Sequence, residues 1–188
     1  MTLRLSGGRR LVSPPGSTAR PTAARVRLAV INLLAPQIPG CRWLDLCCGS
    51  GVMACEALQR GARTVVAIDR DRRVAAVARQ NLAAVAGSLP SPEGRSDVRV
   101  IAADALRWLA QDRPIDGAQE PFDLIYLDPP WPAGLHAPLS EAVAAGGWLQ
   151  PGGTLIWECP SEKPPTVPQG WSLRDERRYG GSTLVMLE

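Results

Sequence analysis

The sequence has few of the residues that build disulfide frameworks, zinc sites or membrane spans. It holds five cysteines, an odd number without metal-ligand spacing, and one histidine, His136. We therefore expect reduced core cysteines and no metal. The longest apolar run near the N-terminus, residues 28–36, is too short for the roughly 20 residues of a membrane span. The first dozen residues lack the pattern of a secretion signal, so we expect a cytoplasmic protein.

Acidic residues are absent from the first 44 positions, which hold seven arginines. The remaining 144 residues carry 18 acids against 14 bases, so a segment of charge +7 precedes a body of charge −4. This asymmetry predicts that the N-terminus meets a polyanionic partner, although a solvated basic tail is the alternative. Lysine is also scarce, with one lysine against 20 arginines. Arginine suits planar phosphate contacts, but a biased genome gives the same ratio.

Length and pattern predict one compact α/β domain. The chain has 188 residues, 45% of them hydrophobic, and its strand and helix patterns alternate. Such alternation implies a mostly parallel sheet with helices on both faces. Residues 171–178 and 183–187, joined by Gly180-Gly181-Ser182, are expected to close the sheet as an antiparallel hairpin and to complete seven strands. The other strands are expected at 42–47, 64–68, 98–102, 122–127 and 154–159, with helices at 52–60, 72–86, 105–111 and 138–148.

Residues 1–40 have a different pattern. Alternating residues at 3–5 and 11–12 predict a short β-hairpin arm. A helix is expected to begin at Pro21-Thr22 and to end before Pro36, because apolar residues recur between them at helical spacing. Arg25 and Arg27 lie off that apolar stripe, so we expect both to face a ligand.

The first chemical motif is residues 44–51, LDLCCGSG, a strand that enters a glycine turn and then a helix. Glycine is needed where the backbone turns sharply beside a ligand. The spacing from Gly49 to Ala54 also fits the dinucleotide fingerprint, and Asp69 follows where a ribose-binding acid belongs. A nicotinamide or flavin enzyme is therefore a rival interpretation.

Asp45 favours a different ligand, because an acid before the glycine turn suits an amine or a cation better than a pyrophosphate. S-adenosylmethionine is such a ligand, and the motif resembles that of the Rossmann-like class I methyltransferases that use it. The resemblance implies that Asp69 binds the ribose hydroxyls and that Asp104 and Ala105 lie near the adenine. The expected cofactor-binding residues are Asp45, Cys47, Gly49, Ser50, Gly51, Asp69, Arg70, Asp104, Ala105 and Asp128.

The second motif is Asp128-Pro129-Pro130-Trp131, directly after the strand expected at 122–127. In an open parallel sheet, ligands bind beyond the carboxyl ends of the strands. The prolines lack amide donors, so carbonyl and carboxylate acceptors face a substrate that presents N–H groups. Trp131 offers a surface on which a base stacks. The motif resembles that of amino-methyltransferases acting on adenine, cytosine, guanine or glutamine, and we expect these four residues to be catalytic.

The N-terminal residues narrow the choice among these substrates. Residues 4–11, 20–22, 25–27 and 32–34, followed by 56–58 and 60–62, resemble the RsmD family of 16S ribosomal RNA guanine-N2 methyltransferases. Three positions depart from the usual pattern of the family. Leu28 stands where Glu is usual, Trp131 where Phe or Tyr is commoner, and Asp69 where Glu is frequent. The resemblance implies that residues 1–40 contact RNA and that residues 41–188 form the methyltransferase domain of a monomer. The expected RNA-binding residues are Arg4, Arg9, Arg10, Arg20, Arg25 and Arg27.

Three alternatives stay open at this point. An adenine-N6 methyltransferase on DNA or RNA would use the same four-residue turn. An RNA-binding module without catalysis would keep the fold, although intact acids at 45, 69, 104 and 128 argue against it. A nicotinamide dehydrogenase would use the glycine turn. Among the remaining residues, His136 is expected at the surface. The tryptophans other than Trp131 are expected in the core. Glu158 is assigned no role.

Overall fold

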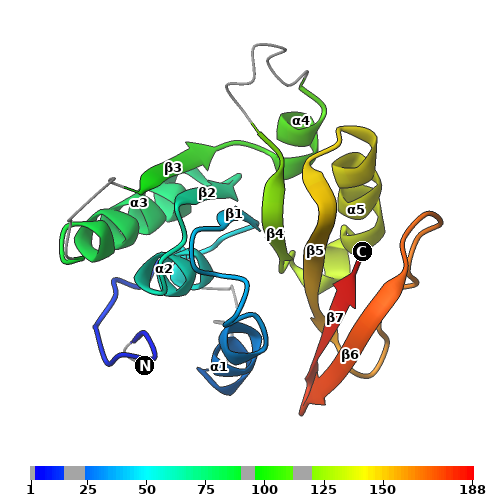
Figure 1. Cartoon of the computed structure of the whole chain (residues 1–188), viewed down its shortest axis with the longest axis horizontal. Helices are drawn as coiled ribbons and strands as arrows, with labels where there is room; N and C mark the ends of the chain where they lie inside the picture. The colour runs from blue at the N-terminus through cyan, green and yellow to red at the C-terminus, as the bar shows by residue number, and fades with distance from the viewer. Residues whose placement is uncertain (1–2, 15–23, 90–95, 112–119) are drawn as a thin grey trace.

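A computed structural model describes residues 3–14, 24–89, 96–111 and 120–188. One seven-stranded sheet runs through the molecule in the order β3-β2-β1-β4-β5-β7-β6 (Figure 1). Strands β1 to β5 pair in parallel, and β7 pairs antiparallel with both β5 and β6. The strands are β1 (Arg42–Leu46), β2 (Thr64–Asp69), β3 (Asp97–Ala102), β4 (Phe122–Leu127), β5 (Leu149–Pro160), β6 (Leu173–Tyr179) and β7 (Ser182–Leu187).

Helices cover both faces of this sheet (Figure 1), which confirms the predicted fold class. On one face lie α1 (Ala24–Leu33), α2 (Val52–Gln59) and α3 (Arg72–Ala86). On the other lie the short α4 (Ala105–Leu109) and α5 (His136–Ala145). No helix in the described ranges is long and apolar enough to cross a membrane.

The central strands hold the sheet together because they are buried on both faces. Strands β1, β2 and β4 are nearly continuous apolar runs, as parallel strands between two helical layers require. Their side chains divide between two core clusters, one beneath α1, α2 and α3 and the other beneath α4 and α5. All five cysteines are free thiols, and all but the half-buried Cys47 are buried.

Several element boundaries differ from the prediction. Strand β5 begins five residues early, at Leu149, and its pairing with β4 shifts register between Phe122 and Leu124. The N-terminal hairpin forms, but only as one antiparallel bridge between Arg4 and Arg10. The expected start of the first helix at 21–22 lies outside the described residues.

The expectation that His136 lies at the surface is wrong. Helix α5 begins at His136, two residues before its predicted start, and this residue is 2% exposed. Its Nε2 lies 2.9 Å from the carbonyl oxygen of Glu158, and its ring lies 5.4 Å from that of Trp157. Burial lowers the pKa of His136, so the neutral ring is a core residue.

Candidate active site

The carboxyl ends of β1, β2 and β4 lie at the same edge of the sheet, because the three strands are parallel and β1 pairs with the other two up to its last residue. Leu46 lies beside Ile68 on one side and Leu127 on the other. The chain order also reverses between β1 and β4, which makes this edge the switch point where open α/β sheets bind ligands. The structure therefore brings together the residues that follow these strands, as the sequence predicted.

The turn between β1 and α2 is held by three residues in the left-handed region. Cys47, Gly49 and Gly51 have φ of 63°, 55° and 73°. A Cβ at Gly51 would lie 3.1 Å from the Ala78 Cβ of α3, whereas one at Gly49 would meet nothing within 4 Å. Gly51 thus lets α2 pack against α3, and Gly49 leaves open space in front of the turn.

Alanine substitution distinguishes the roles of these two glycines by the stability that each variant loses. Gly51→Ala is expected to lower the free energy of unfolding by about 2 kcal/mol, because it adds left-handed strain to a clash with α3. Gly49→Ala has the same strain without the clash, so its stability loss is expected to be about half as large. Urea unfolding of both variants measures the difference, and equal losses would contradict the packing role of Gly51.

Asp69 ends β2 and holds the glycine turn from the side. One carboxylate oxygen accepts from the Gly49 amide and the other from the Asp71 amide, both at 2.9 Å. Burial raises the pKa of Asp69, while those two amides and the neighbouring Arg70 oppose the shift. A carboxylate has about four acceptor positions, so capacity for ligand hydroxyls remains.

Asp45 is buried behind the glycine turn, between β1 and the start of α2, and does not face the open space beside Gly49. It is 2% exposed, and its Oδ2 accepts from the Ala54 amide in the first turn of α2 at 3.1 Å. Burial raises its pKa to about 8, against the opposing effect of that hydrogen bond. The structure thus gives Asp45 a role that the sequence did not predict, which is to fasten β1 to the start of α2.

The raised pKa makes stability depend on pH. The unfolded chain ionises Asp45 near pH 3.9, whereas the folded chain keeps the proton until about pH 8. Stability contributed by this group is therefore present at low pH and falls as the pH rises from about 4 to 8. Asp45→Asn keeps an acceptor for Ala54 and cannot ionise. We expect the variant to be more stable than the wild type at pH 8, by on the order of a few kcal/mol.

Urea unfolding of both proteins at pH 5 and pH 8 measures this difference. Asp69 and the other titrating groups are present in both proteins. The change between pH 5 and pH 8 in the stability difference between wild type and Asp45→Asn therefore reports Asp45 alone. A difference that is the same at the two pH values would show that Asp45 is already ionised in the folded protein at pH 5.

The remaining predicted cofactor residues lie along the same edge. Asp104 is exposed and caps α4, accepting from the Arg107 amide at 3.0 Å. Ala105 is half-buried as the first residue of that helix, and Arg70 is exposed beside Asp69. The Ser50 carbonyl accepts a hydrogen bond of 2.9 Å from the side-chain Nδ2 of Asn81, a residue of α3.

Asn81, which the sequence did not single out, ties the glycine turn to the N-terminal arm. It is 2% exposed and also exchanges hydrogen bonds with the backbone of Val12, at 2.8 and 2.9 Å. One side chain therefore fixes both Ser50 in the turn and Val12 in the arm.

The Asp128-Pro129-Pro130-Trp131 turn follows β4, beside the glycine turn. Asp128 is half-buried, Pro129 is buried and Pro130 is exposed. The Asp128 charge is one of those that raise the pKa of Cys47, after burial, Asp69 and Asp45. The two predicted motifs therefore share one electrostatic environment.

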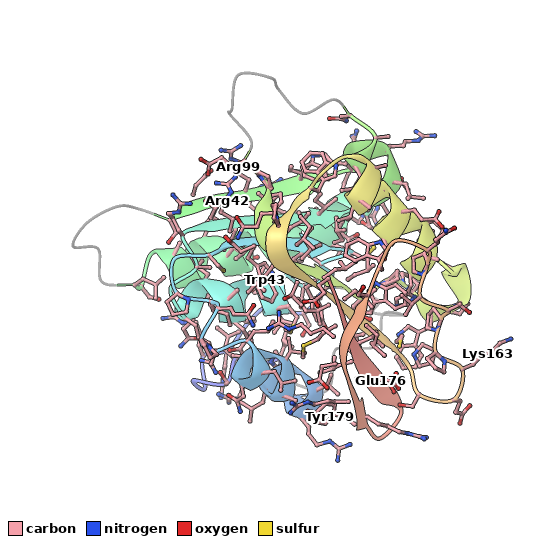
Figure 2. All side chains as sticks on the ribbon, turned by 45° about the vertical axis from the view of Figure 1, so that its right-hand side comes forward. Arg42, Trp43, Arg99, Lys163, Glu176 and Tyr179 are labelled. Atoms are coloured by element: carbon pink, nitrogen blue, oxygen red, sulfur yellow. The ribbon has the colours of Figure 1, made fainter. Side chains whose placement is uncertain are left out.

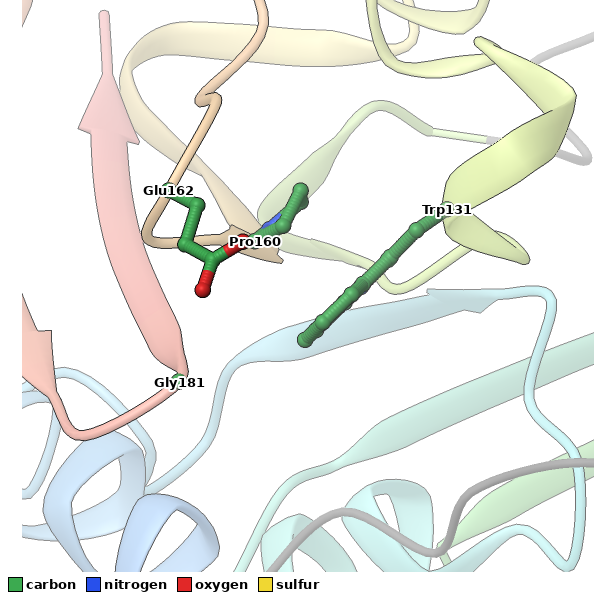
Figure 3. Close-up of a pocket in the computed structure, with 4 residues that line it drawn as sticks. All are labelled: Trp131, Pro160, Glu162 and Gly181. Atoms are coloured by element: carbon green, nitrogen blue, oxygen red, sulfur yellow. The ribbon is translucent and has the colours of Figure 1, made fainter.

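Trp131 begins a single turn of 3₁₀ helix that ends at Ala133, and it forms one wall of a pocket. The pocket has a volume of about 270 Å³ and is also lined by Pro160, Glu162 and Gly181 (Figure 3). Pro160 ends β5, and Gly181 lies in the turn between β6 and β7. Sequence analysis predicted Trp131 but missed the other three, which lie on segments distant in the chain.

A buried polar network supports this pocket from below. Glu158 is 4% exposed and accepts from the Tyr126 hydroxyl at 2.7 Å and the Ser182 hydroxyl at 3.0 Å. Burial and the Glu158 charge raise the pKa of Tyr126 well above its ordinary value, so the phenol keeps its proton. Glu158 thus joins β4, β5 and β7. The signal for it in the sequence is an acid within an otherwise apolar strand.

Four of the five described arginines that were expected to bind RNA are exposed. Arg4, Arg9 and Arg10 lie on the hairpin at the surface. Arg25 is exposed on α1, and its Nη2 lies 2.8 Å from where a Cβ on Gly180 would be. Its guanidinium thus reaches the β6–β7 turn, whose next residue, Gly181, lines the pocket. Arg20 lies outside the described residues.

The expectation that Arg27 faces a ligand is wrong. It is 5% exposed, and its Nε donates to Glu56 Oε1 of α2 at 3.1 Å. Glu56 is fully buried and also accepts from the amide and hydroxyl of Ser6, at 2.7 and 2.6 Å. A second guanidinium nitrogen of Arg27 donates to the Arg4 carbonyl. Arg27 is therefore an internal clamp that joins α1, α2 and the arm.

The arrangement of the sheet and the two motifs defines a class I methyltransferase fold. In the described ranges, no group of three or more His, Cys, Asp or Glu residues is placed to hold a metal ion. The solved structure of the Escherichia coli protein yhhF, described as a candidate methyltransferase, covers the whole chain with a TM-score of 0.80 and 32% identity, and 97% of that protein is matched.

Sequence comparison identifies the family. The model for the family described as Conserved hypothetical protein 95 matches residues 5–188. Ribosomal RNA small subunit methyltransferase D of Escherichia coli K12 is 33% identical over 92% of this chain and 81% of its own length. The protein of that name from Haemophilus influenzae is 31% identical over 92% and 84%. The chain belongs to this family, the RsmD family.

Proposed function

We propose that the chain transfers a methyl group from S-adenosylmethionine to the exocyclic N2 amine of a guanine in 16S ribosomal RNA. The observation that carries this proposal is the Asp128 to Trp131 turn at the switch point of the sheet, beside the glycine turn. Relatives named as ribosomal RNA small subunit methyltransferases support the choice of substrate.

The residues around the glycine turn fit S-adenosylmethionine. Gly49 leaves space in front of the turn, and Asp69 has spare acceptor positions for ribose hydroxyls. We assign the adenine region to Asp104 and Ala105 at the start of α4. Asp45 and Arg70 flank the turn from below and beside it. Burial raises the pKa of Asp45, and a bound cation nearby would favour its ionised form, so this residue suits a cationic ligand better than a pyrophosphate. When bound, this cofactor supplies an electrophilic methyl group on a positively charged sulfur.

The Asp128 to Trp131 turn would orient the amine. Pro129 and Pro130 have no amide hydrogen, so the turn offers acceptors without competing donors. We assign the substrate N–H groups to the Asp128 carboxylate and the carbonyls beside it, and the base ring to the Trp131 face. Holding these hydrogens directs the nitrogen lone pair, and Asp128 offsets the positive charge that develops on the nitrogen.

The N-terminal part, residues 1–40, would hold the RNA. Guanine N2 lies on the pairing edge, so the nucleotide must be unpaired or extruded before it reaches the site. We assign phosphate contacts to Arg4, Arg9, Arg10 and Arg25, which give position rather than sequence choice. RNA binding should therefore weaken steeply as salt rises.

Label transfer from S-adenosylmethionine to different acceptors tests the proposal. The acceptors are small ribosomal subunits and naked 16S RNA from cells that lack the enzyme, and double-stranded DNA. We expect label in the ribosomal RNA and none in DNA. Label in DNA would favour the adenine-N6 alternative. Binding of the cofactor and RNA without label transfer would favour a module without catalysis.

A further inference from the structure

The pocket beside Trp131 has an acid on the wall opposite the tryptophan. Figure 3 shows the Glu162 side chain across the pocket from the Trp131 ring, with its carboxylate directed toward the space between them. Both residues lie at the carboxyl ends of neighbouring strands, because Trp131 follows β4, Glu162 follows β5, and Leu127 pairs with Trp157. A base stacked on Trp131 would therefore occupy the space toward which the Glu162 carboxylate is directed.

We infer that Glu162 is a specificity-determining residue, whose carboxylate accepts the N1–H of the target guanine. This inference rests on the proposed function and names the group that selects the base. Asp128 and Glu162 then have separate tasks: Asp128 orients the amine, and Glu162 recognises the neighbouring ring nitrogen.

An acid at this place distinguishes guanine from adenine by elementary chemistry. An ionised carboxylate only accepts hydrogen bonds. Guanine carries a hydrogen on N1, whereas adenine N1 is an acceptor with a lone pair. Guanine therefore gains a charge-assisted hydrogen bond, while adenine turns a lone pair toward a negative charge. This choice is one that Asp128 does not make, because both bases carry an exocyclic amine.

The backbone beside Glu162 is held in place, although its side chain is exposed. The Ser161 amide donates to the Gly181 carbonyl at 3.0 Å, and the Ser161 hydroxyl lies 2.9 Å from that of Thr183. These bonds fix the segment after β5 to the β6–β7 turn and to the start of β7. Among the described residues, no salt bridge engages the Glu162 carboxylate. Its acceptor positions therefore remain open to a ligand.

Replacing the target guanine by 2-aminopurine tests the N1 contact. This base keeps the exocyclic N2 amine but has no hydrogen on N1, so only the contact to Glu162 and those to O6 are lost. The experiment compares kcat/KM for guanine and 2-aminopurine in an RNA fragment that spans the mapped target. It uses wild type, Glu162→Gln and Glu162→Ala, with Lys163→Ala as the matched control. Lys163 is the next residue and points away from the body of the protein (Figure 2).

We expect the wild type to prefer guanine, and both Glu162 variants to reduce that preference by about 10- to 100-fold, the effect of one charged hydrogen bond. Lys163→Ala should keep the wild-type ratio. An unchanged ratio in both Glu162 variants would overturn this inference and leave the proposed function intact. If the wild type methylates no guanine at all, the proposed function and the inference both fail.

Discussion

Asp128→Asn is expected to lower the rate of methyl transfer by about 10²- to 10³-fold, the effect of removing one preorganised charge from a transition state. The reason is local: the carboxamide has the shape of the carboxylate, but it presents N–H donors and no negative charge. Cofactor affinity should change by only a few fold, because the glycine turn and Asp69 are untouched. Single-turnover kinetics with labelled cofactor measures the rate, and equilibrium binding measures the affinity.

Asp175→Asn is the matched control for this change. Asp175 lies on β6 and pairs with Arg177 at 2.8 Å on the surface. The same chemical substitution there should leave the transfer rate within the error of the assay. If Asp128→Asn destroys cofactor binding together with transfer, the turn is a structural support of the cofactor site and not the group that orients the amine.

Arg27→Met is expected to lower the free energy of unfolding by about 3–5 kcal/mol, because it leaves the buried Glu56 carboxylate without its cation. The apolar stem of Arg27 is kept by the methionine, so the loss reports the ion pair and the bond to Arg4 rather than a cavity. For a chain of this size, the thermal midpoint should fall by on the order of 10 °C. Urea and thermal unfolding measure both values.

Arg25→Met, two residues earlier on the same helix, is the control for Arg27→Met. Arg25 is exposed, so this variant should keep its stability within about 0.5 kcal/mol. It should instead weaken RNA binding and reduce the slope of log affinity against log salt by about one. If Arg27→Met reduced the salt slope without loss of stability, the original expectation of an RNA contact at Arg27 would be restored.

The sequence predicted the sheet well because each central strand has a local signal. Strand β4 has the predicted bounds, and the edge with Cys47, Asp69 and Asp128 follows from parallel pairing alone. The antiparallel hairpin of β6 and β7 followed from the glycines between them. These features depend on neighbours along the chain, so pattern and spacing are sufficient to find them.

Features that depend on distant partners were missed. Arg27 and Glu56 are 29 positions apart, and neither residue alone shows that two charges will be buried together. His136 follows a turn that contains proline and glycine, which favours a surface position, yet its ring is covered by β5. Figure 2 shows Tyr179, from the end of β6, beside α1, and it packs against the core cluster that includes α1. The pocket beside Trp131 arises in the same way, from three segments that the fold brings together.

The nature of the methylated nucleoside tests the proposed function most directly. Small-subunit RNA from cells lacking the enzyme is incubated with the protein and labelled S-adenosylmethionine, digested to nucleosides, and separated by chromatography with mass detection. We expect all label in N2-methylguanosine, mapped to one position. Label in N6-methyladenosine, or no label in ribosomal RNA, would contradict the proposed guanine-N2 methyltransferase activity.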